Sequence, residues 1–421
     1  MINNEKTTTE YSGLKRVGIF GSTGSIGTQA LEIIDRSDGR LIPVFLSCAE
    51  NVKKLKEQIE KFDPEAVCVG KEIAEHHDEN DASGTGDEDI VVSLKKEYPG
   101  VKVFCGAEGL VEAAAVLDID VMLNSLVGIS GLAPTLSFIG RRDSSGRKIA
   151  LANKETLVTG GRFVTEAALD AGLSIKPVDS EHSAIYQCLR GNDISSVRRI
   201  ILTASGGPFR GWEKEQLVNI TPEQALAHPN WNMGAKITID SATMINKAFE
   251  IIEAKWLFGL SAEQIDVVIH PQSIAHSFVE FKDGMILSQL GAPDMRPPIS
   301  YALSMPDRWE INADFIDFAG IGSLEFEAPG GFIKRSLDLA YKVLRHSEQG
   351  FDSPSIVLNG ANEELVAMFL RREIAFPEII DICDRILEGH EPVKIQNPAE
   401  IFETDKMARS SVGEAIRELR Q

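Results

Sequence analysis

The sequence of 421 residues predicts an α/β fold in three parts: a parallel-sheet domain, a smaller α/β domain and a C-terminal helical bundle. From about residue 14, short apolar runs alternate with segments of helical periodicity, which is typical of a parallel sheet covered by helices on both faces. Beyond residue 179 the strand-like runs surround one long amphipathic helix, and from residue 333 the pattern is mostly helical.

The first predicted domain spans residues 14–178 and contains most of the strand–helix alternation. Apolar runs predict strands at 16–20, 41–47, 66–69, 101–104, 121–124 and 148–152. Helices are expected from residue 26, after the first strand, and at 51–61, after the second. The acidic, turn-rich stretch 76–89 interrupts the alternation, and charged blocks of this kind are typical of solvated surface insertions rather than of metal-binding loops.

The second predicted domain covers residues 179–304, and a linker, 305–332, connects it to a helical domain at 333–421. Strands are expected at 199–203, 267–270, 277–281 and 285–289. A strong helix is expected near 242–258, with Ser241 as its N-cap. Its apolar stripe consists of Ile245, Phe249, Ile252 and Trp256, and the first helix of the last domain has a similar stripe of Leu337, Leu339, Ala340, Val343 and Leu344.

Composition excludes several classes of function. With 43 Lys and Arg against 63 Asp and Glu, the net charge is −20, which argues against a general nucleic-acid-binding protein but not against a small phosphorylated ligand. The five cysteines are scattered and form no CxxC pair, which favours a reducing compartment over a disulfide or zinc framework. No apolar run approaches the roughly 18 residues that span a membrane, and the N-terminal segment resembles neither a signal nor a transit peptide, so we expect a cytoplasmic protein.

A glycine-rich turn, Gly-Ser-Thr-Gly-Ser-Ile-Gly at 21–27, joins the first predicted strand to the first helix. Glycines allow a tight turn and close approach of a pyrophosphate, and the following helix N-terminus supplies free N–H groups. The strand, turn and helix occur in the order that a Rossmann-like dinucleotide site requires, although the spacing is GxxGxxG rather than GxGxxG. A strand-to-helix turn without a ligand is the alternative.

Two further segments carry carboxylates that could bind a hard cation. If 179–181 is extended, Asp179 and Glu181 point to one face and could chelate Mg²⁺ or Mn²⁺. In the strong helix, Asn246, Lys247 and Glu250 share a sector outside the apolar stripe. Taken separately, each pattern is more typical of a solvated surface; taken together, they offer three carboxylates beside a cation and an amide.

Two loops have the composition of ligand-binding segments. Ser205, Gly206 and Gly207 follow a strand and would expose N–H groups and a hydroxyl to a phosphate, although a plain Gly-Pro turn is equally compatible. The loop His228–Gly234 places a Trp among Pro, Gly and Asn. Such a Trp can cover a ligand and exclude water, or it can anchor the loop to the protein's own core.

The order of these segments resembles the deoxyxylulose-phosphate reductoisomerase family over nearly the whole chain from about residue 14. The segments that resemble the family are GSTGSIG, ALANKETLV (150–158), PVDSEHSAI (177–185), TASGGPF (203–209), HPNWNMG (228–234), IDSATMINKAFEIIEA (239–254), HPQS (270–273), QLGAPDMRPPI (289–299) and NGANEE (359–364). The resemblance implies an NADPH-dependent and Mn²⁺- or Mg²⁺-dependent rearrangement and reduction of a phosphorylated sugar. It further implies a V-shaped homodimer with a Rossmann-like NADPH domain, a catalytic domain and a C-terminal helical domain.

The resemblance also implies a role for each matching residue of this sequence. NADPH would be bound by Thr23, Gly24, Ser25, Ile26, Asn51, Asn153, Glu155 and Gly234; the metal by Asp179, Glu181 and Glu250; and the substrate by Lys154, Ser180, Glu181, Ser205, His228, Ser241, Asn246, Lys247 and Glu250. Lys154, Glu181 and His228 would be catalytic, and His228, Trp231 and Met233 would lie on a closing lid. His182 and His276 are candidates for proton transfer, to which the sequence assigns no group.

Several positions depart from the family pattern. Ala49 and Glu50 precede Asn51 where the family has Gly and a polar or basic residue, and an acid there would repel the 2′-phosphate of NADP. The stretches 76–89 and 141–147 look like surface insertions, and Gly360 replaces a usual Ala. Two other functions remain compatible with the residues: a metal-dependent phosphosugar isomerase or aldolase without dinucleotide use, and a non-catalytic nucleotide-sensing regulator.

Overall fold

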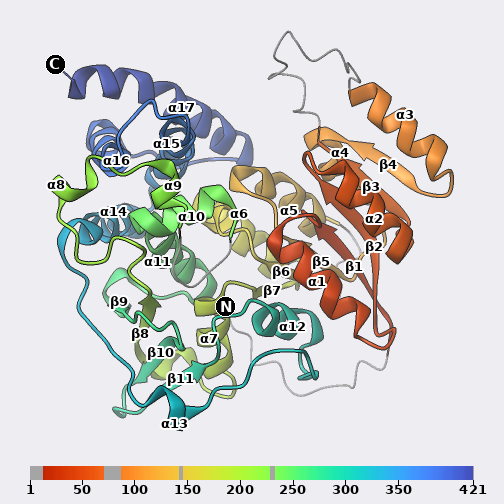
Figure 1. The fold of residues 1–421 in the computed structure, drawn as a ribbon, viewed down its shortest axis with the longest axis horizontal. Coiled ribbons are helices and arrows are strands. Elements are labelled where there is room, and N and C mark those ends of the chain that lie inside the picture. The colour runs from red at the N-terminus through yellow and green to blue at the C-terminus, as the bar shows by residue number, and fades with distance from the viewer. Residues whose placement is uncertain (1–12, 71–86, 142–145, 228–232, 421) are drawn as a thin grey trace.

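The structure, a computed structural model, describes residues 13–70, 87–141, 146–227 and 233–420. A seven-stranded parallel sheet forms the first part of the molecule, in the order β4-β3-β2-β1-β5-β6-β7 (Figure 1). Its strands are β1 Lys15–Phe20, β2 Leu41–Cys48, β3 Ala66–Val69, β4 Lys102–Cys105, β5 Val121–Asn124, β6 Lys148–Leu151 and β7 Ser174–Pro177. The order reverses at β1, which pairs with β2 on one side and β5 on the other, and ligands of open α/β sheets bind outside such a switch point.

Helices cover both faces of this sheet, as predicted. They are α1 Ser25–Asp35, α2 Val52–Phe62, α3 Asp87–Glu97, α4 Gly106–Val116, α5 Leu132–Ile139 and α6 Glu155–Asp170. Alternate strand residues enter two separate cores: Val17 and Ile19 pack with residues of α1 and α2, whereas Phe20 packs with residues of α4, α5 and α6. The predicted strands of the whole chain are confirmed to within two residues at each end, and β7 was not predicted.

A second sheet has four strands in the order β11-β10-β8-β9. The elements of this second part are α7 Ser180–Cys188, β8 Val197–Ala204, α8 Lys214–Leu217, α9 Pro222–Ala225, α10 Ala235–Thr243, α11 Ile245–Phe258, β9 Ile265–Ile269, β10 Ala275–Phe281 and β11 Ile286–Leu290, with single 3₁₀ turns at Ile194–Ser196 and Ala262–Gln264. Helix α12 Arg296–Ser304 follows β11, and a further 3₁₀ turn, Gly128–Gly131, lies between β5 and α5 of the first part. Strand β10 is antiparallel to both neighbours, and β8 is parallel to β9.

Two local predictions for this region are wrong. Asp179 and Glu181 are not on an extended strand: Asp179 is the N-cap of α7, because its carboxylate accepts from the N–H groups of Glu181 and His182. Ser241 is not an N-cap, because it lies inside α10 and the chain breaks between helices at Met244, whose φ of 64° is left-handed.

The C-terminal part is helical, as predicted: α14 Gly331–Glu348, α15 Ser353–Leu370, α16 Glu378–Gly389 and α17 Pro398–Leu419. The predicted linker, 305–332, contains the short helix α13 Phe318–Ile321. The predicted stripe of α14 is buried. Helix α15 lies at the centre, packed against α16 and α17 and also against α6 and α10. A Cβ on Gly360 would lie 2.9 Å from the carbonyl oxygen of Asp405, so Gly in place of Ala allows α15 to approach α17 closely.

Helix α12 belongs by packing to the first sheet, because Ile299, Ala302 and Leu303 join the core beneath α1. The predicted domain boundaries, after residues 178, 304 and 332, stay predictions. Among the described helices, none is both long and apolar enough to cross a membrane.

Candidate active site

The glycine-rich turn lies at the carboxyl end of β1, where the strand order reverses. Gly21 has a φ of 94°, and a Cβ there would lie 2.6 Å from the carbonyl oxygen of Ser125. A Cβ on Gly27 would lie 2.3 Å from the carbonyl oxygen of Gly21, so both positions require glycine. Gly24 is the N-cap of α1, and no described side chain caps its first turn. Thr23, Gly24, Ser25 and Ile26 are exposed or half-buried at this turn.

Asn51 lies at the neighbouring strand end. Its side chain caps α2 by accepting from the N–H of Lys54 at 3.0 Å, and the Lys54 ammonium donates to the carbonyl oxygen of Thr23 at 3.1 Å. The glycine turn and Asn51 therefore share one edge of the sheet. Glu50 is exposed beside them, in the turn that follows β2.

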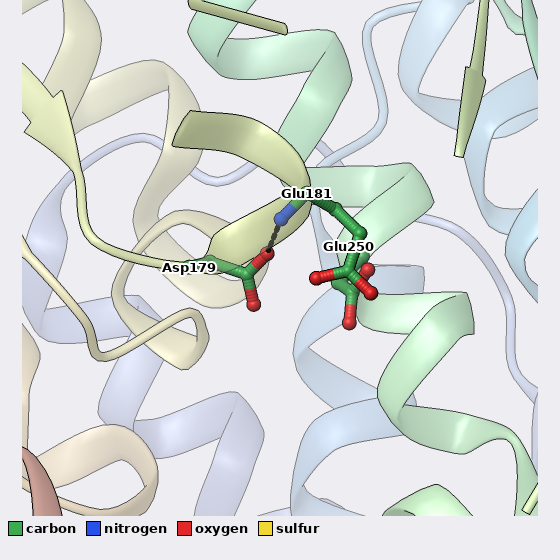
Figure 2. A group of neighbouring side chains, drawn as sticks. All are labelled: Asp179, Glu181 and Glu250. Carbon is green, nitrogen blue, oxygen red and sulfur yellow. Dashed lines mark hydrogen bonds between the residues drawn. The ribbon is translucent and has the colours of Figure 1, made fainter. Parts of the chain in front are cut away.

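Three carboxylates converge between α7 and α11. Asp179 caps α7, Glu181 lies in its first turn and Glu250 comes from α11, with one ligand oxygen from each within 4.8 Å of the others (Figure 2). The Glu250 side chain is only 1% exposed. Burial, together with Asp179 and Glu181, raises the pKa of Glu250 to about 7, so the cluster carries more negative charge than its surroundings stabilise.

Two lysine ammonium groups neutralise part of this charge. Lys154 lies 3.1 Å from a carboxylate oxygen of Asp179 and 3.5 Å from one of Glu250, and it donates to the side-chain oxygen of Asn246 at 2.6 Å. Lys247 donates to Glu181 at 2.7 Å and also to Glu250. Burial disfavours both charged ammonium groups, but the adjacent carboxylates outweigh it and raise both pKa values.

A buried histidine and a fourth carboxylate lie behind the cluster. His182 has its Nδ1 3.2 Å from both Asp179 and Glu253, and its Nε2 lies 2.9 Å from the carbonyl oxygen of Glu250. Burial opposes a charge on His182, but Glu253 and Asp179 raise its pKa to about 9; burial raises the pKa of Glu253 to about 7. The sequence analysis missed Glu253, although its spacing of three residues from Glu250 places both on neighbouring turns of one helix. Burial lowers the pKa of the other candidate, His276 of β10.

The segments expected at the substrate phosphate are adjacent. A Cβ on Gly207 would lie 2.9 Å from the carbonyl oxygen of Ser241, so the Ser205 loop contacts α10 directly. Ser205 and Ser241 are half-buried, and Lys247 follows one turn into the next helix. The hydroxyl of Ser180 donates to the carboxylate of Glu181.

Glu155 and Gly234 belong to the side of the site nearer the first sheet. Glu155 opens α6 and is bonded to Asn153 at 3.0 Å and to the ammonium of Lys236 at 2.6 Å. Gly234 is the N-cap of α10, and Met233 before it is half-buried. His228 and Trp231 lie outside the described residues.

Together these features define an α/β protein whose first sheet carries a dinucleotide-type glycine turn and whose second unit supplies a partly buried, all-oxygen carboxylate cluster. Three family models match the chain: 1-deoxy-D-xylulose 5-phosphate reductoisomerase at 17–161, the C-terminal domain of that enzyme at 175–258 and the DXP reductoisomerase C-terminal domain at 290–411. The chain belongs to the 1-deoxy-D-xylulose 5-phosphate reductoisomerase family.

Relatives that carry this enzyme name are similar in sequence to the chain over nearly its full length. The protein from Chloroherpeton thalassium is 44% identical over 95% of this chain and 97% of its own. The protein from a Geobacillus species is 47% identical over 95% of this chain and 99% of its own.

Solved structures give the same result. The reductoisomerase from Zymomonas mobilis, in complex with NADPH, superposes with a TM-score of 0.82 at 36% identity, covering 95% of this chain and 98% of that one. A DOX-P reductoisomerase in complex with NADPH, fosmidomycin and magnesium superposes with a TM-score of 0.85 at 35% identity, covering 97% and 100%.

Proposed function

We propose that this protein converts 1-deoxy-D-xylulose 5-phosphate to 2-C-methyl-D-erythritol 4-phosphate, using NADPH and a divalent metal ion, in non-mevalonate isoprenoid precursor biosynthesis. The observation that carries the proposal is the convergence of Asp179, Glu181 and Glu250 next to two buried lysines. Family membership supports the reaction. The solved relatives with NADPH and magnesium support the two cofactors.

The donor set suits a hard divalent cation. Asp179, Glu181 and Glu250 offer only carboxylate oxygens, which Mg²⁺ and Mn²⁺ prefer, and the two lysines leave the five groups with a net charge of −1 when all are ionised. When bound, the ion would polarise the substrate carbonyl as a Lewis acid and stabilise developing negative charge. We propose Mn²⁺ as well as Mg²⁺ as ions that serve here.

Lys154 and Lys247 pair with the three carboxylates. A cation bound by these carboxylates would release both ammonium groups for contacts with the substrate. Lys154, Ser180 and Glu181 would then contact the carbonyl end. Binding of the remote phosphate positions the reacting end, since binding energy away from the reacting atoms restricts their motion.

We assign the binding of the substrate phosphate to Ser205, Ser241, Asn246 and Lys247. His228 would also contact the substrate. The contact of the Ser205 loop with α10 at Ser241 supports this assignment. His228, Trp231 and Met233 would cover the bound sugar and exclude water, so that the skeleton can break and rejoin and the branched aldehyde can be reduced.

For NADPH, we assign Thr23, Gly24, Ser25 and Ile26 to the pyrophosphate side, with Asn51 beside them and Asn153, Glu155 and Gly234 nearer the reacting end. The free first turn of α1 and the Lys54 contact to Thr23 support the first group. Glu50 stands where the 2′-phosphate would approach, and its exposure leaves it free to turn away.

We further propose a cytoplasmic homodimer. Strand β11 is at the edge of the described four-stranded sheet and exposes Ile286 and Leu287, with Met285 just before it. Phe315 is 97% exposed and Phe318 is 65% exposed, both in the segment that follows α12. Open edges and clustered apolar side chains of this kind are usually covered by another subunit.

The two other functions weighed from the sequence are not favoured. An isomerase without dinucleotide use gives no reason for a turn that demands glycine at both Gly21 and Gly27. A sensor gives no reason for three carboxylates that converge around one buried and two half-buried side chains.

The test follows absorbance of the reduced nicotinamide with deoxyxylulose phosphate and Mn²⁺, comparing NADPH with NADH. Oxidation that requires both substrate and metal supports the proposal. No oxidation by folded, metal-loaded protein would refute it.

A further inference from the structure

A line of buried polar contacts joins helix α15, in the C-terminal helical part, to the loop after β6. Asn362 donates to Asp240 at 2.8 Å, Lys236 lies 2.9 Å from the other oxygen of Asp240 and donates to Glu155 at 2.6 Å, and Asn153 donates to Glu155 at 3.0 Å. We name these five residues the polar network. Its members come from α15, α10 and the start of α6, so it connects three distant parts of the sequence.

Each member of the polar network depends on the next for its orientation. Asn362, Asp240 and Asn153 are at most 2% exposed, Glu155 is 7% exposed and the Lys236 side chain is 17% exposed. Bulk water therefore has little access to replace a lost partner. The charges alternate along the line, with Lys236 between two carboxylates. Burial opposes a charge on Glu155, but the Lys236 ammonium outweighs it and lowers the Glu155 pKa.

The next residue of α15 makes a second contact with the same region. Glu363 accepts from the backbone N–H of Ile129 at 3.2 Å, and a Cβ on Gly128 would lie 2.7 Å from its carboxylate. Asn153 donates to the carbonyl oxygen of Gly128 at 2.9 Å. Asn362 and Glu363 of the NGANEE segment therefore contact helix α10 and the loop after β5, respectively.

We propose that Asn362 is a positioning residue for the dinucleotide: through Asp240 and Lys236 it sets the orientation of Glu155 and the start of α10 at Gly234. This inference rests on the assignment of Asn153, Glu155 and Gly234 to NADPH. Asn362 itself lies beneath the site on α15, and its contact is with Asp240. The C-terminal helical part thus acts on cofactor binding. Among the described residues, no hydrogen bond or ion pair joins Asp179, Glu181 or Glu250 to the polar network, and the two sites adjoin at Lys154, which pairs with Asp179 and Glu250 and stands between Asn153 and Glu155 in the sequence.

The experiment compares Asn362→Leu with Asp352→Asn in the full-length protein. Leu keeps approximate side-chain volume but removes the donor to Asp240, so Lys236 should turn toward Asp240 and away from Glu155. Asp352 forms a two-point ion pair with Arg162 of α6, at 3.1 and 2.7 Å, and so joins the same two parts of the molecule outside the polar network. Dissociation constants for NADPH, by nicotinamide fluorescence, and for Mn²⁺, by its electron spin resonance signal, are measured on each variant.

We expect Asn362→Leu to weaken NADPH binding about five- to tenfold, in the range of one lost hydrogen bond, and to leave Mn²⁺ binding unchanged. Asp352→Asn should change neither constant. Unchanged NADPH affinity in Asn362→Leu, or an equal loss in Asp352→Asn, would overturn the proposal. If Asn362→Leu does not fold, Lys236→Met is held to the same criteria. Wild-type protein that binds no NADPH would instead contradict the proposed function.

Discussion

Replacing Glu250 by Gln removes one negative charge from the carboxylate cluster with little change in side-chain volume. A carboxylate oxygen about 2.1 Å from a divalent ion interacts with it by about 4 kcal/mol even at the dielectric constant of water. That energy corresponds to a roughly thousandfold weaker dissociation constant. Because Glu250 is almost fully buried, bulk water cannot supply the missing charge, so this value is a lower estimate.

The metal-free protein should not lose stability from the same change. Burial and the two neighbouring carboxylates raise the pKa of Glu250 to about 7, so at pH 8 the ionised Glu250 destabilises the folded state relative to the unfolded state. The neutral side chain of Glu250→Gln removes that charge. Lys247 still pairs with Glu181 in this variant, and Lys154 still pairs with Asp179. Unfolding by urea in the presence of a chelator should therefore show a variant no less stable than the wild type.

Mn²⁺ binding by electron spin resonance measures the effect directly. Glu253→Gln is the matched control, because Glu253 is equally buried one turn further along α11 and contacts His182 instead of pointing into the cluster. A group that acts through a ligand typically costs about 10- to 100-fold, which is distinguishable from the loss expected for Glu250. Unchanged Mn²⁺ affinity in Glu250→Gln would refute the assignment of Glu250 as a ligand.

Three further outcomes are expected. Lys247→Met should tighten Mn²⁺ binding by substrate-free protein, since Lys247 competes for Glu181 and Glu250, yet weaken binding of a phosphate-bearing sugar; titrating both ligands tests this, and parallel changes would contradict it. In metal-free protein the raised pKa of Glu250 means that the folded state binds more protons than the unfolded state between about pH 4.5 and 7, so the stability of wild type relative to Glu250→Gln should fall as pH rises through that window; urea unfolding at several pH values checks the sign. Glu50→Arg should lower the KM for NADPH about fivefold and leave the KM for NADH unchanged, because an exposed charge pair contributes about 1 kcal/mol; equal effects on both coenzymes would exclude a role at the 2′-phosphate.

The sequence was sufficient for the parallel sheet because its strands are buried on both faces and appear as short apolar runs. It was also sufficient for the carboxylates of Asp179, Glu181 and Glu250 as candidates, since family segments marked each of them. The local geometry was not predictable in the same way. Asp179 caps a helix instead of ending a strand, because the N–H groups of Glu181 and His182 bind its carboxylate.

Partners that are distant in the sequence could not be predicted. Lys154 contacts Glu250 across 96 positions, and Asn362 contacts Asp240 across 122, and no periodicity connects such pairs. The break at Met244 was missed because its left-handed conformation is set by packing, since the residue type gives no indication of it. The sequence singled out neither Lys236 nor Glu253, and only their contacts with the buried side chains of Glu155 and His182 identify them as part of the site.

The most direct measurement for the central claim is the fate of the hydride. With NADPH carrying deuterium at the transferred position, deoxyxylulose phosphate and Mn²⁺, the product should be a methylerythritol phosphate whose mass is one unit above that made with unlabelled NADPH, and none should form when the metal is chelated. An unlabelled product, or an isomerised sugar formed without NADPH oxidation, would contradict the account.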